Sequence, residues 1–469
     1  MTPQCLAAIA IWVLVFGAFA FTQRSPGVIA AGLVFGWLFL PNFTFDMPVG
    51  PSCDKPMLVA MVSAVAALAI PVPRKAGITL SWTDLPALGM TVFAVPPSII
   101  TGLGLTDGLW SACENFWVWT VPFFIGRRVF CTPERAAVLL RVLLAGGLLY
   151  VGFCLFEMKM SPRLHKIVYG LEPREGQNYF TQAVRYGLWR PTVFMEHGLA
   201  LAFLMSGISI LAWWASLTGT VEKILGVSAR TVAWVLSITT LLCVSSGAVI
   251  IMAVGYFSVR MFRFRMGRYV LLAATMIPVV YPVSRMLGSS TFVNAVISMA
   301  EAASSQLGSE RSGSFQFRVD NEDDMLQSWK NNPLFGAARK FRHLGERARA
   351  VTDSYWIIML GRFGLLGWMS WTAMMCLPAF LLVLRRNVWL SGGAMVGQCF
   401  ALLAVLFAID GQLNAMPNPI FVVMAGAALG LSGQSVAESV RPAQRESAAP
   451  KKPVRRLWPA GSVRQVFAY

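Results

Sequence analysis

Long apolar runs separated by short polar segments extend along most of the chain. The runs are about 14 to 22 residues long, and about 20 apolar residues span the hydrocarbon core of a bilayer. Backbone groups inside lipid must find partners within the protein, so we expect helices rather than open strands. The pattern predicts an all-α, polytopic integral membrane protein with about 12 or 13 transmembrane helices. The runs lie at 4–22, 27–40, 57–72, 85–103, 108–125, 136–157, 197–216, 230–244, 247–262, 269–287, 361–384, 388–408 and 415–433.

One large polar stretch interrupts the apolar pattern and divides the chain into parts. The last part is rich in Pro, Ala, Ser and Arg, a composition typical of disorder. We therefore predict the first part of a helix bundle at 1–287, one large loop at 288–354, the last part of the bundle at 355–436 and a basic tail at 437–469.

The distribution of Lys and Arg predicts the orientation, because short cytoplasmic loops carry an excess of both. An even number of runs separates each basic cluster from the next, so all the clusters can lie in the cytoplasm together with the tail. This orientation places the N-terminus outside, and the large loop becomes periplasmic. The basic clusters are Arg74-Lys75, Arg127-Arg128, Lys223 with Arg230, 260–268 and Arg385-Arg386. The outer segments are 41–56, 104–107, 158–196, 245–246, 288–354 and 409–414.

Composition excludes several classes of protein. Only 13% of the residues are charged, and the net charge of +17 is explained by basic loops and a basic tail attracted to anionic lipid. No basic face on a folded module is visible, so we expect no nucleic-acid partner. The eight cysteines show no metal-ligand spacing and are interpreted as small buried hydrophobic residues. We therefore predict no metal site.

The first candidate site lies where the chain re-enters the membrane after the outer segment 158–196. Arg185, Arg190, Glu196 and His197 fall close together there. Arg presents a planar fork of donors that suits phosphate, so these arginines could bind an anion. Alternatively, they anchor a span at the interface.

A second candidate is the outer hairpin around Ser245 and Ser246. Small polar residues at a tight turn can let backbone N–H groups face a ligand. They are also common where helices pack closely.

The large loop holds Arg318, then a predicted helix over 320–329 that ends at Asn331-Asn332-Pro333, and then His343 and Asp353. Asp353 precedes the next apolar run, where it could cap a helix or act as a general base. His343, like His165, is a lone histidine in a polar loop.

Two acidic residues lie within apolar runs. Glu114 is about two turns inside the fifth run, where a charge is costly and is usually paired or functional. Glu157 is near the outer end of the sixth run and is expected at the membrane interface.

Several of these segments resemble the O-antigen ligase/polymerase family. In that family an N-P-L-x-G turn in the periplasmic loop is followed by H-N-S-Y-L and a G-x-x-G at the next helix. Related patterns occur near the earlier arginines and at an S-R-G-A hairpin. The matching segments here are Asn332-Pro333-Leu334-Phe335-Gly336, Thr352-Asp353-Ser354-Tyr355-Trp356, Gly361-Arg362-Phe363-Gly364-Leu365-Leu366-Gly367, Arg185 to His197 and Ser245-Ser246-Gly247-Ala248.

The chain differs from the family pattern at two positions. The family His aligns with Thr352, followed by Asp353 where Asn is usual, and the hairpin Arg aligns with Ser246. If the family His is the base, the resemblance implies that Asp353 replaces it or that His343 approaches from the loop.

The resemblance implies a multi-pass glycosyltransferase of the bacterial inner membrane that needs neither metal nor cofactor. Such enzymes take a saccharide from undecaprenyl diphosphate at the periplasmic face and pass it to another saccharide or to the lipid A core. The expected substrate-binding residues are Arg185, Arg190, His197, Arg318, Ser245, Ser246 and Glu114.

A transporter or flippase for a charged or lipid-linked solute is the alternative. It would show broken helices and charges deep in the bundle.

Overall fold

The computed structural model describes residues 1–71, 80–172, 183–185, 187–264, 266–288, 321–343, 354–384 and 395–439. In these residues the protein is built almost wholly of α-helices, with three short two-stranded hairpins. A further helix occupies 321–329. The first group of elements is α1 (Pro3–Gln23), α2 (Pro26–Phe39), β1 (Thr44–Phe45), β2 (Cys53–Asp54), α3 (Lys55–Leu68), η1 (Trp82–Asp84), α4 (Leu85–Val92), α5 (Pro96–Ile100), α6 (Leu105–Asn115), the π-helix η2 (Phe116–Thr120) and α7 (Val121–Val129).

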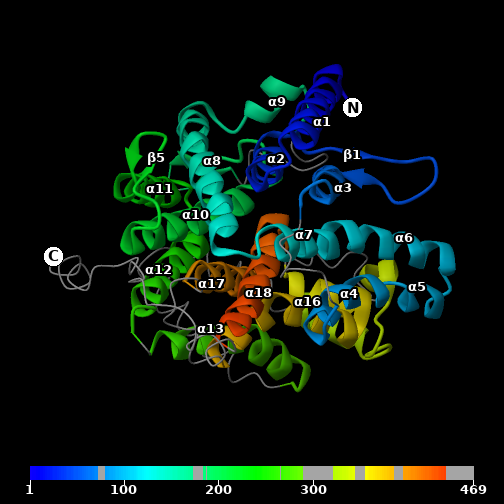
Figure 1. The fold of residues 1–469 in the computed structure, drawn as a ribbon. Coiled ribbons are helices and arrows are strands. Elements are labelled where there is room, and N and C mark those ends of the chain that lie inside the picture. The colour runs from blue at the N-terminus through cyan, green and yellow to red at the C-terminus, as the bar shows by residue number, and fades with distance from the viewer. Residues whose placement is uncertain are drawn as a thin grey trace.

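The remaining elements complete the bundle around the centre of the molecule (Figure 1). They are α8 (Pro133–Met160), α9 (Leu164–Tyr169), β3 (Val184–Arg185), β4 (Leu188–Trp189), α10 (Gly198–Thr218), β5 (Lys223–Ile224), β6 (Val227–Ser228), α11 (Ala229–Leu242), α12 (Ser246–Met261), α13 (Gly267–Met286), the 3₁₀ helix η3 (Ala338–His343), α16 (Tyr355–Leu384), α17 (Met395–Asp410) and α18 (Pro419–Ser439).

Six described segments are long and apolar enough to cross a membrane, and six shorter apolar helices accompany them. This composition is that of an all-α membrane protein. The long segments are Pro3–Gln23, Trp82–Ile100, Pro133–Met160, Gly198–Thr218, Gly267–Met286 and Tyr355–Leu384.

The starts of several helices follow from local sequence. A hydroxyl side chain accepts a backbone N–H at the N-cap of α1, α2 and α8, and a proline follows each cap. Proline suits this position because its missing N–H would have had no partner inside the helix. The caps are Thr2, Ser25 and Thr132.

The observed helices differ from the predicted runs in two places. The predicted run 85–103 is interrupted, because α4 ends at Val92 and α5 begins at Pro96. The run predicted from 361 begins earlier, at Tyr355, and α16 is broken at Gly364 (φ 67°, ψ −164°).

The tightest packing in the bundle joins α7 to α18, which lie together near the centre in Figure 1. Glycines allow this approach. A Cβ on Gly126 would overlap the Val423 carbonyl, and one on Gly426 would overlap the Phe123 carbonyl. Small residues are the usual means by which membrane helices bring their backbones together.

Contacts join the predicted outer segments to one another. The Thr2 hydroxyl donates to the Tyr169 carbonyl, and the Lys55 ammonium donates to the Phe194 carbonyl. The Tyr355 N–H donates to the Gly411 carbonyl. We call the side where these segments meet the loop side, and its assignment to the periplasm stays a prediction.

Candidate functional site

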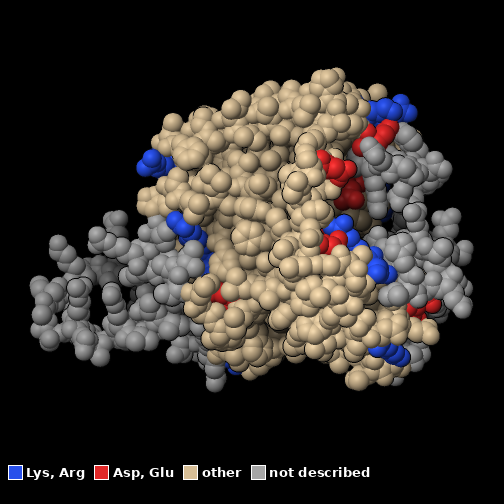
Figure 2. Space-filling model, turned by 90° about the vertical axis from the view of Figure 1, so that its right-hand side faces the viewer, with Lys and Arg blue, Asp and Glu red and all other residues tan. Residues whose placement is uncertain are grey.

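Charged side chains from four separate parts of the chain converge on the loop side. We call Asp54, Glu114, Glu196 and Arg362 the charged cluster. An Arg362 Nη lies 3.7 Å from a Glu114 carboxylate oxygen, and the charges of Glu114 and Glu196 both act on Asp54. Figure 2 views the side where α5, α6 and the β1–β2 hairpin lie, and shows acidic and basic side chains around a hollow. A site of this kind can bind both anionic and hydroxyl groups.

Asp54 is held at the start of α3. Its Oδ1 accepts the N–H of Met57 at 2.9 Å, and strand β2 pairs with β1 just before it. Burial, together with the negative charges of Glu114 and Glu196 and against the opposing effect of the Met57 N–H, raises the pKa of Asp54 to about 6. This carboxyl therefore exchanges protons near neutral pH.

Lys55 follows Asp54 in the chain and is only 2% exposed. Its Nζ donates to the Phe194 carbonyl at 2.9 Å and lies 5.2 Å from the centre of the Trp37 ring. Glu196 is the acidic group whose charge acts on this lysine. Lys55 thus ties α3 to α2 and to the segment that precedes α10.

A backbone contact between the loop and α16 positions Arg362. The N–H of Leu365 donates to the Pro333 carbonyl at 2.9 Å, and the N–H of Ala337 donates to the Gly361 carbonyl at 2.8 Å. The turn 332–336 therefore replaces part of the internal hydrogen bonding of α16 where that helix breaks. Arg362 lies between Gly361 and Leu365, the two residues of α16 that make these hydrogen bonds.

The segment after the turn reaches across to α5 and α6. Arg339 lies 3.4 Å from the carboxylate of Asp107, which also accepts the Ser98 hydroxyl at 2.8 Å. The Lys340 ammonium donates to the Thr101 carbonyl at 2.6 Å. Part of the large loop thus spans the ends of separate helices.

The helix 321–329 is fixed to the bundle through Glu322, which is 2% exposed. Its carboxylate accepts the Tyr281 hydroxyl at 2.7 Å, the Ser354 hydroxyl at 2.8 Å and the Trp356 indole N–H at 3.0 Å. Burial raises the pKa of Glu322, and these three donors and the charge of Arg285 lower it. Arg285 also bonds Asp323 at 2.8 Å.

The structure brings two predicted substrate-binding segments together. Arg190 is 4% exposed, and its Nη2 donates to the Val244 carbonyl at 3.0 Å. In the same hairpin Ser245 is buried and Ser246 is exposed. The buried Arg190 side chain therefore joins its own segment to the hairpin through this hydrogen bond.

Of the other predicted site residues, two have described side chains. His197 is the N-cap of α10, where its Nδ1 accepts the Leu199 N–H at 3.1 Å. Glu114 pairs with Arg362 as described. Arg318 and Asp353 lie outside the described residues, as do the side chains of Arg185 and His343, whose backbones lie in β3 and η3.

The structure shows the contacts of Glu157 and His165, two residues that the sequence placed only near helix ends or in loops. Glu157 is fully buried and accepts the N–H groups of Leu164, Thr192 and Val193, so other segments of the protein hold its carboxylate; its position at the membrane interface stays a prediction. His165 joins two segments: its Nε2 accepts the Asn42 N–H at 2.8 Å and its Nδ1 donates to the Leu171 carbonyl at 2.7 Å. Burial lowers the pKa of His165 to about 4.

Sequence reasoning assigned no role to Asp54, Lys55 or Arg362. Arg362 and Lys55 each carry a charge within or beside an apolar run, a pattern that commonly marks functional or paired residues. The pairing itself joins distant parts of the chain and has no local signal.

Neither a known family model nor a curated protein matches the chain.

Proposed function

We propose that the chain is a membrane glycosyltransferase that transfers or polymerises undecaprenyl-diphosphate-linked saccharides. It would act as an O-antigen or exopolysaccharide polymerase, or as an O-antigen ligase. In this proposal the chain crosses the bacterial inner membrane about 12 or 13 times, and 288–354 lies in the periplasm.

One observation carries the proposal. The turn 332–336 is hydrogen-bonded to the backbone of α16 on either side of Arg362, and Arg362 pairs with Glu114 on the loop side. Two of the motifs that resemble the O-antigen ligase/polymerase family, 332–336 and 361–367, are therefore in backbone contact. Their contact supports a shared role in holding a cation and a carboxylate at one place.

The chemistry of these groups suits glycosyl transfer. An acceptor hydroxyl attacks the anomeric carbon, the bond from that carbon to the diphosphate oxygen breaks, and the proton passes to a base. Arg362 would neutralise charge that develops on the diphosphate, as preorganised cations do at a leaving group. The cluster carboxylates Glu114 and Asp54 would accept hydrogen bonds from sugar hydroxyls.

Asp353 is the proposed general base, with His343 as the alternative. Arg185, Arg190 and Arg318 are proposed to contribute to donor binding. The partners are then a lipid-linked saccharide in the bilayer and a saccharide or lipid A-core acceptor.

Length-resolved surface polysaccharide from a deletion strain tests the proposal. Loss of long chains with single units retained on the core would indicate a polymerase. Loss of all core-linked repeats, with polymer accumulating on the carrier, would indicate a ligase. An unchanged polysaccharide profile would remove the proposal.

A second candidate is a transporter or flippase, favoured by the break of α16 at Gly364. Discontinuous helices line the solute sites of many transporters. Purified protein in vesicles separates the two classes: an enzyme forms a new glycosidic bond, whereas a transporter moves unchanged solute across the bilayer.

A further inference from the structure

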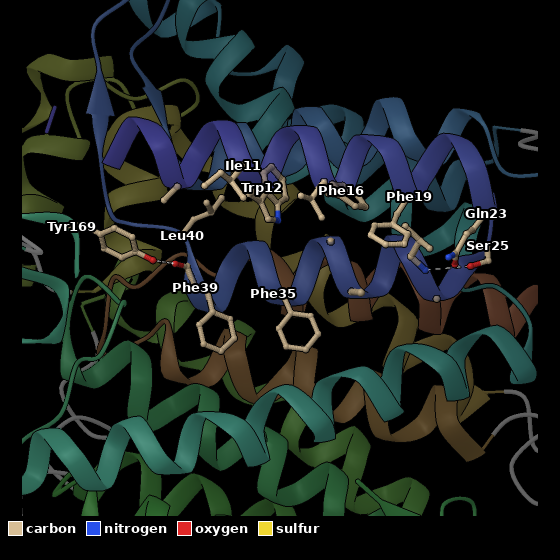
Figure 3. A pocket seen from close by; sticks show the side chains of 16 residues that line it. Ile11, Trp12, Phe16, Phe19, Gln23, Ser25, Phe35, Phe39, Leu40 and Tyr169 are labelled. Carbon is tan, nitrogen blue, oxygen red and sulfur yellow. Dashed lines mark hydrogen bonds between the residues drawn. The ribbon is translucent and has the colours of Figure 1, made fainter. Parts of the chain in front are cut away.

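A long apolar groove runs along the first two helices, and none of its lining residues belongs to the charged cluster. It has a volume of about 750 Å³ and lies between the antiparallel helices α1 and α2 (Figure 3). Aromatic rings form its walls and small residues lie between them. The rings are those of Trp12, Phe16, Phe19, Phe35, Phe39 and Tyr169.

The groove lies where two helices are in direct contact. α1 and α2 touch directly along it, because the Phe16 ring covers Gly32 and the Trp12 ring covers Gly36. A Cβ on Gly36 would lie only 2.6 Å from the Trp12 ring. A helix with its side chains is about 10 Å across, whereas a single hydrocarbon chain is slender. A single hydrocarbon chain therefore suits the groove better than a helix does.

The groove has one closed end and one polar end. At the closed end the Tyr169 hydroxyl donates to the Phe39 carbonyl, and Thr2 donates to the Tyr169 carbonyl. At the other end the lining residues are Gln23 and Ser25 (Figure 3), and Arg24 is exposed between them. α1 has 21 residues and so rises about 30 Å, close to the thickness of a bilayer core.

The polar end is suited to an anion. Arg24 uses its Nε on the Phe21 carbonyl at 3.3 Å, and its Nη groups have no hydrogen bond or ion pair among the described residues. α2 begins at this end, and the first N–H groups of a helix together with its dipole favour negative charge. The Ser25 hydroxyl accepts one of these N–H groups, that of Val28, at 3.4 Å.

We propose that the groove holds an acyl chain of an anionic phospholipid whose phosphate binds Arg24 at the start of α2. The head group enters at the Arg24 end, because Tyr169 closes the end on the loop side. A polyprenyl diphosphate held at the charged cluster would need its head group at that closed end. The lipid site is therefore distinct from the proposed donor site and does not depend on the proposed function.

Native mass spectrometry of the delipidated full chain in detergent tests the site. The probes are phosphatidylglycerol and phosphatidylcholine with the same acyl chains. We expect phosphatidylglycerol to bind at least about tenfold more tightly, because the choline ammonium of phosphatidylcholine offsets the charge of the phosphate and weakens its charge-assisted hydrogen bond with Arg24.

Two variants, each with a control, distinguish binding of the acyl chain from binding of the lipid head group. Ala31→Phe fills the groove and should abolish retention of both lipids, whereas Ala10→Phe, on an exposed position of α1 outside the groove, should leave it unchanged. Arg24→Gln should remove the preference for phosphatidylglycerol, whereas Arg141→Gln, exposed on α8, should keep it.

Three results would overturn the proposal. The first is equal binding of the two lipids by the unaltered protein. The second is an unchanged preference in Arg24→Gln, a variant that alters no packed side chain. The third is a dimer that Ala31→Phe dissociates, because a second copy would then occupy the groove.

Discussion

The backbones of Gly336 and Gly364 lie directly against each other. A Cβ on Gly336 would be 2.5 Å from the Gly364 nitrogen, and one on Gly364 would overlap the Leu334 carbonyl. Both glycines have positive φ, 75° and 67°. This contact joins the loop to the bundle and gives two short sequence motifs a shared structural reason.

Gly364→Ala should destabilise the protein through both conformation and contact. At φ 67° and ψ −164° the backbone is in a region that essentially only glycine occupies, which costs a side chain about 1–3 kcal/mol, and overpacking adds about 1–3 kcal/mol. Gly102→Ala is the matched control, because Gly102 has φ 73° and open space around its Cβ position. Thermal unfolding in detergent should show a clearly larger loss for Gly364→Ala, and equal losses would contradict the contact.

Glu322→Ala should release the helix 321–329 from the bundle. Removing one partner of a buried charged network costs about 3–5 kcal/mol. Asp323→Ala provides the comparison, because the Asp323 side chain is 61% exposed and such pairs contribute about 0–1 kcal/mol. Limited proteolysis within 321–343 should accelerate only in Glu322→Ala. Equal cleavage of the two variants would mean that the loop is held elsewhere.

Asp54 should make stability depend on pH. Its pKa is raised from 3.8 to about 6 by burial and by Glu114 and Glu196, so the folded protein binds more protons than the unfolded chain between these values. The contribution of this group is present below about pH 4 and is lost as the pH rises through about 6. Asn is also a good N-cap, so Asp54→Asn should remove this pH dependence while keeping α3. Melting temperatures of the two proteins across pH 4 to about 7 measure the difference, and parallel curves would refute it.

Arg362→Lys should lower glycosyl transfer by about ten- to hundredfold, because the charge remains but the planar fork of donors is lost. Arg339→Lys serves as the control, since Arg339 is 53% exposed and pairs with Asp107 away from Glu114. Turnover of a lipid-linked saccharide by reconstituted protein is the measurement. Full activity of both Arg362→Lys and Arg362→Ala would move the diphosphate site elsewhere.

Asp353→Asn separates a catalytic base from a helix cap. A base contributes about 10²–10⁴-fold to rate, whereas Asn caps a helix almost as well as Asp. Activity should collapse while the melting temperature hardly changes. If Asp353→Asn remains active and His343→Ala does not, His343 is the base.

Local sequence predicted most of the helices, because a long apolar run is a local signal. It also predicted the helix that the structure has at 321–329. It did not predict the break at Gly364, because the Pro333 and Leu334 carbonyls that receive the freed N–H groups belong to another part of the chain.

Of the charged cluster, only Glu114 and Glu196 were singled out from the sequence, for a similar reason. Asp54 and Arg362 are far from Glu114 in sequence, and only the packing of α3, α6 and α16 brings their charges together. The partners of Glu157 were also not predictable from the sequence. Its position near a helix end predicts the membrane interface, but nothing in the local sequence indicates that three backbone N–H groups from other segments donate to its carboxylate.

The glycine contact between α7 and α18 also constrains biogenesis. α7 is synthesised early, but α18, the helix that fits its glycine surface, is the last in chain order of the helices that the structure describes. Until α18 arrives, the closest packing surface of α7 can meet only lipid or another protein. The contact between α7 and α18 therefore forms only after α18 has been translated, and a chain that stops before Pro419 should be a substrate for membrane quality control.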